Sequence, residues 1–238
     1  MFNFIGVPWV SAAPGKPFLA LWAWGAAHAT QVSRSIVVVA KRAMARYPLS
    51  MFRPAYLAGR WYPSDERTCR EALAIHAADA PTEQGSWRGA VVPHAGWLYS
   101  GQVAAQTLCQ LSYVCPQADL VVVFGAHRTP NDADTLFRAE GWQTPLGNLC
   151  TAHTLLSELN ARLDLDEEPV RTAYPDNAAE VLMPMVRYFF PKAELLMLGV
   201  APTSQAMRIG VEVGTVVHNA GRAAVFIGST DLTHYGPD

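Results

Sequence analysis

The hydrophobic residues of the chain fall into four short continuous runs, separated by longer segments in which apolar positions recur with helical spacing. The continuous runs lie within 88–93, 118–127, 193–202 and 222–236. Polar residues do not alternate inside these runs, so each predicted strand is expected to be covered on both faces. Helical spacing is found within 65–80, 99–114, 151–164, 175–191 and 203–221. This alternation predicts an α/β fold with a mainly parallel sheet and helices on both faces.

Residues suited to capping mark the ends of three predicted helices. Ser64 is expected to cap the helix of 65–80, Asp176 the helix of 175–191, and Thr203 a helix that stops at Gly221. The segment 129–150 has no helical spacing and is predicted to be irregular or rich in β structure.

Composition and charge exclude several classes of protein. Half of the 238 residues are hydrophobic, and the formal net charge is −2 without a basic block, so nucleic acid is not an expected partner. No apolar run is long enough to span a membrane. The four cysteines have no Cys-x-x-Cys spacing, which favours reduced thiols in a cytoplasmic protein over a zinc site built on cysteine. They are Cys69, Cys109, Cys115 and Cys150.

The N-terminal part of the chain differs in charge from the rest. Residues 1–64 contain seven Lys or Arg and no acidic residue, and Asp65 is the first carboxylate. An apolar run that ends in Ala-x-Ala at Ala29 has some features of a signal peptide. We favour the alternative, in which residues 1–52 are a leader outside the fold and 53–238 form the α/β domain.

Three of the four predicted strands are followed by a histidine. These are His94, His127 and His234, the last of them preceded by Asp231. Parallel strands place their carboxyl ends at one edge of the sheet, where ligands bind in such folds. Neutral imidazoles together with a carboxylate predict a divalent metal site, with iron, zinc or copper as the ion.

Nearby residues allow a competing hypothesis. Ser229, Asp231 and His234 could form the triad of a serine hydrolase, but the chain has no Gly-x-Ser-x-Gly motif, and such triads rarely come from one short loop. A phosphate-binding loop is absent from the sequence as well. The glycines at the strand ends are expected to let the backbone turn tightly at a crowded site. They are Gly96, Gly125 and Gly228.

Six motifs in this order and at this spacing resemble the Memo family, whose bacterial and archaeal members are called AmmeMemoRadiSam system protein B. The resemblance extends from Arg53 to Asp238. It implies a fold similar to that of class III extradiol dioxygenases, and a radical-SAM system partner. The motifs are AGRWYP (58–63), PHAGWLYSG (93–101), GAHRTP (125–130), TPLG (144–147), DNAAE (176–180) and STDLTHYG (229–236).

The resemblance also implies roles for individual residues. Members of the family bind iron or copper through two histidines and a cysteine, and His94 and His127 match the two histidines. Asp231 and His234 match a pair in the same pocket, which implies that His234 moves protons and that Asp231 orients it. The remaining pocket residues suggested by the motifs are Asn177, Glu180, Trp61, Tyr62, Trp97 and Tyr99.

The chain departs from the family pattern at three points. Gly125-Ala126-His127 replaces a Gly-Pro-x-His motif and is one residue shorter, and Asn177 stands where the family has a histidine. The family's cysteine ligand lies in a C-terminal segment that has no match here. We therefore expect a truncated domain with apolar sheet surface uncovered.

Three functions follow from these residues. The first is a metal-binding Memo-family protein with an oxidoreductase-type site of iron or copper. The second is a non-catalytic module that binds a small molecule or a peptide in the same pocket, since a fold alone does not establish catalysis. A metal-dependent hydrolase ranks last, because the chain lacks a His-Glu-x-x-His helix.

Overall fold

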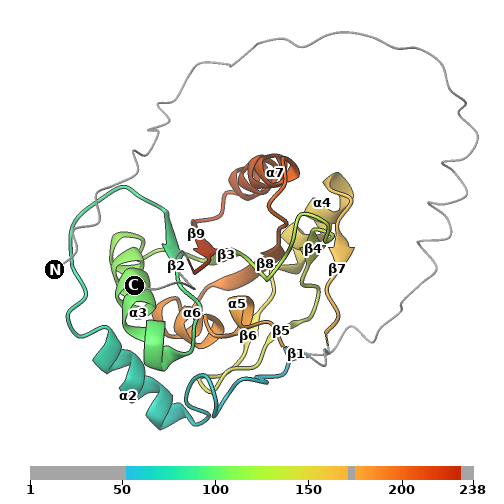
Figure 1. Ribbon diagram of the computed structural model, residues 1–238. Helices are drawn as coiled ribbons and strands as arrows, with labels where there is room; N and C mark the ends of the chain where they lie inside the picture. Colours follow the sequence, from blue (N-terminus) through green and yellow to red (C-terminus); the bar gives the residue numbers. More distant parts are fainter. Residues whose placement is uncertain (1–51, 171–174, 232–238) are drawn as a thin grey trace, which may run out of the picture. The chain divides into compact units, whose positions relative to one another are not determined.

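A computed structural model describes residues 52–170 and 175–231, and its centre is a six-stranded sheet of order β2-β9-β3-β8-β4-β7 (Figure 1). The four predicted strands are the first four in this order, and every neighbouring pair among them is parallel. The predicted α/β class and its mainly parallel sheet are therefore confirmed. The four strands are β2 (Gly89–Val92), β9 (Ala224–Ser229), β3 (Leu120–Gly125) and β8 (Glu194–Gly199).

Short strands complete the sheet and build a second one. Strand β4 runs antiparallel to β8 and pairs with β7 in parallel. The second sheet has three strands in the order β1-β5-β6. The segment 129–150 contains three of these short strands joined by irregular stretches, which agrees with the prediction of an irregular or β-rich segment. Their bounds are β1 (Phe52–Arg53), β4 (Thr135–Leu136), β5 (Gly141–Trp142), β6 (Leu149–Cys150) and β7 (Asp166–Glu167).

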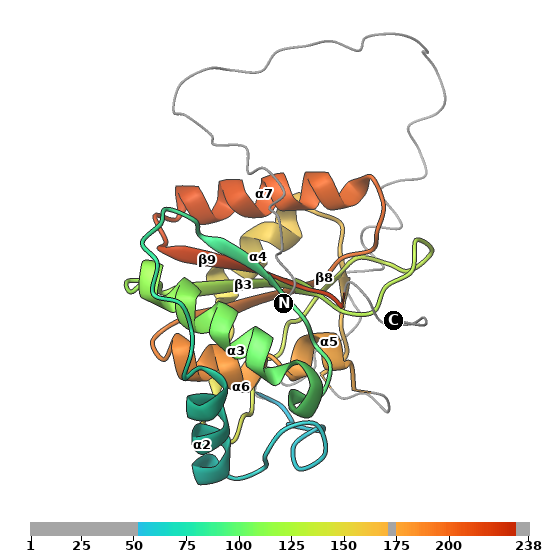
Figure 2. The same ribbon diagram turned by 60° about the vertical axis from the view of Figure 1, so that its left-hand side comes forward.

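Helices cover both faces of the large sheet, as predicted, and Figure 2 shows the sheet nearly edge-on between them. Alternate residues of β3 supply two separate cores: Val121 and Val123 pack with α2, α3 and α6, whereas Leu120 and Val122 pack with α4 and α7. This double burial explains why the strand is apolar throughout. The helices are α2 (Glu66–His76), α3 (Trp97–Val114), α4 (His153–Arg162), α5 (Asn177–Glu180), α6 (Met183–Phe189) and α7 (Gln205–Asn219).

Two predictions about helix ends need correction. The cap of α2 is Asp65 and not Ser64, because the Asp65 carboxylate accepts the backbone N–H of Thr68 at 2.9 Å. Segment 175–191 forms two helices instead of one, and Pro184 lies in the first turn of the second, where its missing N–H is tolerated.

Two of the other predicted helix ends are confirmed. Asp176 caps α5 through the backbone N–H of Ala178. Gly221, just beyond α7, has a φ of 65°, which confirms the predicted stop. The predicted Thr203 cap is wrong, because Ser204 is the N-cap of α7 and its side chain makes no capping hydrogen bond, although Thr203 accepts the N–H of Gln205 at 3.2 Å.

Strand β2 is the edge strand next to β9, and apolar side chains are exposed beside it. Val91 is 57% exposed on the strand itself, and so is Val103 on the neighbouring helix α3.

Within the described ranges, no helix is long and apolar enough to cross a membrane. The leader predicted at 1–52 lies outside the described residues, apart from Phe52, and stays a prediction.

Candidate metal centre at the strand ends

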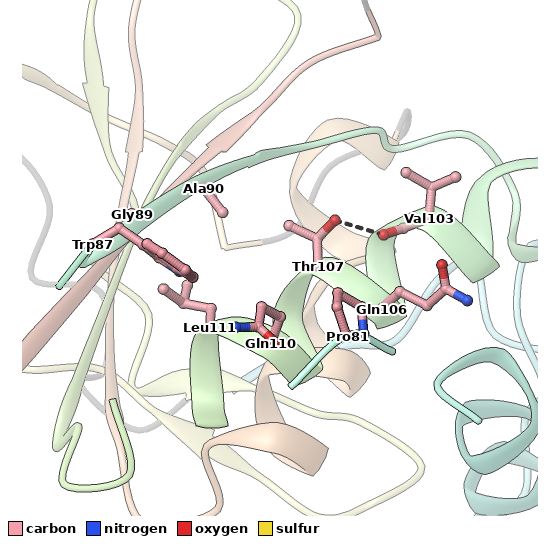
Figure 3. Close-up of a pocket in the computed structure, with 9 residues that line it drawn as sticks. All are labelled: Pro81, Trp87, Gly89, Ala90, Val103, Gln106, Thr107, Gln110 and Leu111. Carbon is pink, nitrogen blue, oxygen red and sulfur yellow. Dashed lines mark hydrogen bonds between the residues drawn. The ribbon is translucent and has the colours of Figure 1, made fainter. Parts of the chain in front are cut away.

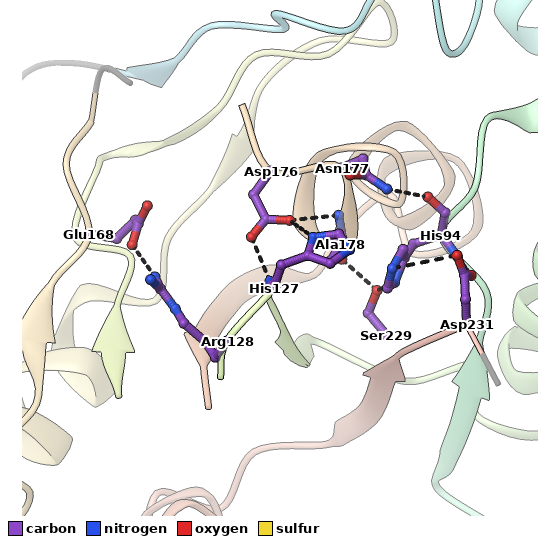
Figure 4. A network of polar contacts seen from close by, with 9 residues as sticks. All are labelled: His94, His127, Arg128, Glu168, Asp176, Asn177, Ala178, Ser229 and Asp231. Atoms are coloured by element: carbon purple, nitrogen blue, oxygen red, sulfur yellow. Dashed lines mark hydrogen bonds and ion pairs between the residues drawn. The ribbon is translucent and has the colours of Figure 1, made fainter. Parts of the chain in front are cut away.

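Strand register brings three of the predicted site residues to one edge of the sheet. Strand β9 lies between β2 and β3, with Val92 aligned to Ser229 and Phe124 aligned to Gly228. The residues that follow these strands are His94, Asp231 and His127, which lie close together in Figure 4. The two imidazole rings meet edge to face, with 5.0 Å between their centroids.

His94 is buried and is held by contacts on three sides. Its backbone N–H donates to Oδ1 of Asp231 at 2.8 Å, and its carbonyl accepts the side-chain amide of Asn177 at 3.0 Å. The ring Nδ1 lies 3.0 Å from the hydroxyl of Ser229, and Nε2 lies 3.7 Å from Oδ2 of Asp231. The predicted proximity of His94 to Asp231 and Asn177 is therefore found in the structure.

His127 is more exposed and is held by one carboxylate. Asp176 accepts the backbone N–H of His127 on Oδ2 and meets the ring Nδ1 with Oδ1, both at 2.8 Å. The same carboxylate caps α5 through the N–H of Ala178 at 2.9 Å. A single acidic side chain thus joins the end of β3 to the start of α5.

The contacts of each ring indicate which of its nitrogens carries the proton. An ionised carboxylate only accepts hydrogen bonds, so Nδ1 of His127 must be the protonated nitrogen facing Asp176. The hydroxyl of Ser229 donates its single proton to the carbonyl of Ala178, so it must accept a proton from Nδ1 of His94. In the neutral form of each ring the basic nitrogen is therefore Nε2.

The orientation of Ser229 also bears on the hydrolase hypothesis. An activated serine nucleophile donates its proton to a histidine, whereas Ser229 donates to a backbone carbonyl. This arrangement gives the serine no general base.

Backbone strain at the site lies at an alanine and not at the predicted glycines. Ala126 has a φ of 85°, which is uncommon for a residue with a side chain, and it directly precedes His127. Of the three predicted glycines only Gly125 stands where a Cβ would crowd its neighbours, 3.0 Å from Cβ of Ser229 and 3.1 Å from the carbonyl oxygen of Ala178. A Cβ on Gly96 or Gly228 would meet only ordinary contacts.

Glu180 belongs to a separate buried network. Its Oε1 accepts the N–H of Leu57 at 2.6 Å and the hydroxyl of Tyr62 at 2.8 Å. Burial raises the pKa of Glu180 above its ordinary value, although these hydrogen bonds oppose the shift. Burial and the neighbouring carboxylate also raise the pKa of Tyr62. Both residues therefore fix the loop before α2 against α5.

The predicted pocket aromatics divide between different surroundings. Trp61, Tyr62 and Trp97 line a hollow of about 510 Å³ beside α2, and the indole N–H of Trp97 donates to the carbonyl of Val181 at 3.0 Å. Tyr99 is 83% exposed and does not line this hollow. His234 lies outside the described residues, so its role stays a prediction.

A second hollow of about 300 Å³ lies between β2 and α3 (Figure 3). Trp87 and Leu111 contribute apolar walls, and Gln106, Thr107 and Gln110 contribute polar ones. Neither this hollow nor the one beside α2 is lined by His94 or His127.

Sequence reasoning missed two contributors to the strand-end site. Asp176 was expected only as a helix cap, yet it also holds His127, which is 49 positions away in the sequence. Ser229 was considered only as a nucleophile. An acidic residue before a helix gives no signal of such a distant partner, but the Asp-Asn pair at the start of the short helix could have drawn attention.

Whether these residues suit a metal ion depends on the donors that they present. Imidazole nitrogen is a common ligand of divalent metals, and a carboxylate on the distal nitrogen, as at His127, is typical of metal-ligating histidines. Within 52–170 and 175–231, however, no three His, Cys, Asp or Glu residues are grouped so as to hold an ion. The two histidines thus fit as ligands, while a complete ligand set is not present among the described residues.

Fold and site together define an α/β protein with a histidine and carboxylate cluster at the carboxyl edge of a parallel sheet. A family model described as Memo-like protein matches residues 53–238, and this chain therefore belongs to the Memo family. A MEMO1 family protein of Methanococcoides burtonii is 33% identical over 190 residues, covering 78% of this chain and 69% of that protein. A MEMO1 family protein of Methanosarcina mazei is 31% identical over 198 residues, covering 79% and 68%.

Proposed function

We propose that this Memo-family chain binds an iron or copper ion at the strand ends and uses it in redox chemistry. The observation that carries the proposal is the matched placement of the two rings, which meet at one edge of the sheet and each have a hydrogen-bond partner at Nδ1. This arrangement suits Nε2 as the ligand atom of each ring. His94 and His127 would hold the ion, and it would supply Lewis-acid and electron-transfer chemistry.

The residues around the ring of His94 favour a cation at this point. In its neutral form, Nε2 of His94 is a hydrogen-bond acceptor, and it lies 3.7 Å from a carboxylate oxygen of Asp231. A carboxylate beside a ring nitrogen favours positive charge at this point, whether a proton or a metal ion carries it. Asp231 is anchored by the backbone N–H of His94, so its carboxylate stays directed at the site. His234, by resemblance, would move protons there.

Metal content of the anaerobically purified full-length chain tests the proposal. Elemental analysis is expected to find iron or copper near one equivalent in the wild type after incubation with either ion, and a loss in His94→Ala and His127→Ala. His218→Ala is the matched control, because His218 is exposed in the last turn of α7. Absence of both metals from the wild type, or unchanged content in His94→Ala, would overturn the proposal.

The second candidate is a non-catalytic module that binds a small molecule or a peptide. The hollow beside α2 favours it, because Trp61 and Leu98 present apolar surface there next to the side chains of Tyr62 and His76. Fluorescence anisotropy with a pool of labelled short peptides, measured with and without EDTA, separates the two functions. Peptide binding that persists in EDTA and is weaker in Trp61→Ala supports the non-catalytic module. Peptide binding of the wild type that is lost when EDTA is added contradicts it.

A partner and a location complete this proposal. By the resemblance, a radical-SAM system protein would be the partner. The cysteines without Cys-x-x-Cys spacing, as reduced thiols, suggest the cytoplasm as the location. Co-purification of the chain with a radical-SAM enzyme encoded in the same genome, under anaerobic conditions, is the corresponding test.

A further inference from the structure

Three consecutive residues at the start of α5 reach both histidines of the candidate centre (Figure 4). Asp176 meets Nδ1 of His127, and the side chain of Asn177 donates to the carbonyl of His94. The carbonyl of Ala178 accepts the hydroxyl of Ser229, which in turn faces Nδ1 of His94. One short segment therefore connects the ends of β2, β3 and β9.

We propose that Asp176 and Ser229 are positioning residues that hold His127 and His94 in the tautomer with the proton on Nδ1. Only the purpose of this tautomer rests on the proposed function. That purpose is to direct the Nε2 lone pairs of both rings to one ion. The placement of the protons follows from the hydrogen bonds alone.

The carboxylate of Asp176 can only accept hydrogen bonds, and it accepts them from three donors. Its two oxygens take the N–H and Nδ1–H of His127 and the N–H of Ala178. An isolated neutral imidazole prefers its proton on Nε2, so the carboxylate has to reverse that preference. By accepting the N–H of His127, it also fixes the backbone just after Ala126, which has a strained positive φ.

Ser229 performs the same task indirectly. A hydroxyl has one proton, and here it is committed to the carbonyl of Ala178, so the serine oxygen is left to accept from His94. The carbonyl of Ala178 in α5 therefore sets the direction of both hydrogen bonds of Ser229. Rotation of α5 would therefore disturb both rings at once.

Long-range ¹⁵N–¹H NMR of the imidazoles reads the tautomer directly and needs no bound metal. The labelled full-length chain, stripped with EDTA and held at a pH where its seven histidines are neutral, is expected to show Nδ1–H for both His94 and His127. In Asp176→Asn, only His127 should change to Nε2–H, because the amide offers one acceptor oxygen instead of two. In Ser229→Ala, only His94 should change.

Matched variants separate positioning from folding. Asp65 caps α2 with the same kind of carboxylate bond, so Asp65→Asn should leave both tautomers unchanged. Asp176→Ser retains a capping oxygen for α5 but is too short to reach the ring of His127, and it should give the same tautomer change as Asp176→Asn. An Nε2–H ring at His127 in the wild type, or an unchanged ring in both Asp176 variants, would overturn the inference.

Metal affinity then tests the purpose of the tautomer. Loss of such a partner typically weakens binding about 10- to 100-fold, so titration of Asp176→Asn with ferrous or cupric ion should show a decrease of that size. A tautomer change without a change in affinity would refute the link to metal binding while leaving the positioning role intact. If the wild type binds neither ion, the proposed function fails, and the NMR result still decides the positioning role.

Discussion

The hydroxyl of Tyr62 donates a hydrogen bond of 2.8 Å to Oε1 of Glu180, a residue 118 positions further along the chain. Glu180 is only 1% exposed, and the same oxygen accepts the backbone N–H of Leu57. Because Glu180 is the last residue of α5, this contact ties the loop before α2 to the helix whose first residues reach both histidines. The predicted motif residues Tyr62 and Glu180 therefore support the site from outside it.

Replacing Tyr62 by Phe should destabilise the domain. The change removes a hydrogen bond to a buried charged acceptor, so the free energy of unfolding is expected to fall by about 1.5–3 kcal/mol. Urea unfolding monitored by circular dichroism measures it. Tyr99→Phe is the control, because Tyr99 is 83% exposed and its variant should stay within about 0.5 kcal/mol of the wild type. Equal effects in the two variants would show that the bond to Glu180 contributes nothing.

The buried carboxyl of Glu180 predicts a particular pH dependence of stability. Because burial raises its pKa in the folded state above the ordinary 4.5, the native state binds the proton more tightly than the unfolded state does. This contribution is complete below pH 4.5 and is lost as the pH rises through the raised folded value. Glu180→Gln should remove the decline, so the wild type should lose stability relative to the variant as the pH rises.

Asp65 provides a control whose contribution to stability depends on pH in the opposite direction. Hydrogen bonds from Thr68 lower the pKa of Asp65, so its contribution is present above its ordinary pKa of 3.8 and is lost as the pH falls. Chemical unfolding of the wild type, Glu180→Gln and Asp65→Asn at a series of pH values distinguishes the two. A difference between wild type and Glu180→Gln that does not vary with pH would contradict the prediction.

The sequence predicted the large sheet well because its central strands are buried on both faces. Their runs, such as Leu120–Phe124, are apolar without interruption, and this pattern alone indicates a covered parallel strand. Shorter strands such as β4 and β7 could not be placed, since two residues have no periodicity. The separation of 175–191 into two helices was missed, although Pro184 marks the start of the second.

The candidate site was predictable only where a strand led directly into it. His94, His127 and Asp231 follow strands, so topology alone brings them together. Asp176 and Ser229 act through hydrogen bonds across 49 and 135 positions, which depend on packing and leave no mark in the sequence. The strain at Ala126 was not foreseen either, because the neighbouring Gly125 is the residue type suited to a tight turn.

Ala126→Gly should stabilise the domain. A residue with a side chain at a φ of 85° is strained, and glycine relieves that strain, so a gain of up to about 1 kcal/mol is expected. Thermal unfolding measures the effect. Ala74→Gly is the control: Ala74 is an exposed residue inside α2, where glycine should cost about 1 kcal/mol. Destabilisation in both variants would show that packing of the Ala126 methyl group outweighs the strain.

Arg53→Lys should destabilise the junction between the two sheets. The guanidinium of Arg53 lies over Trp142 and Phe137, at 4.6 and 4.9 Å from their ring centroids, and it donates to the carbonyl of Pro169. A lysine keeps the charge but loses the flat stacking surface, so a loss of about 1–3 kcal/mol is expected. Urea unfolding tests this, with the exposed Arg67→Lys as control. An unchanged midpoint would mean that charge alone stabilises this position.

Metal should raise the melting temperature of the chain if His94 and His127 bind it. A ligand that binds only the folded state stabilises it by about 2.7 kcal/mol at a free concentration of 100 times Kd. Differential scanning calorimetry under anaerobic conditions, with ferrous or cuprous ion added at increasing concentration, should show a rising Tm that EDTA reverses. His94→Ala and His127→Ala should not respond. His153→Ala should respond like the wild type, since His153 is an exposed residue at the start of α4. A Tm increase of the same size in His94→Ala would assign the stabilising ion to another part of the chain, because an imidazole that binds the ion cannot be removed without weakening the effect.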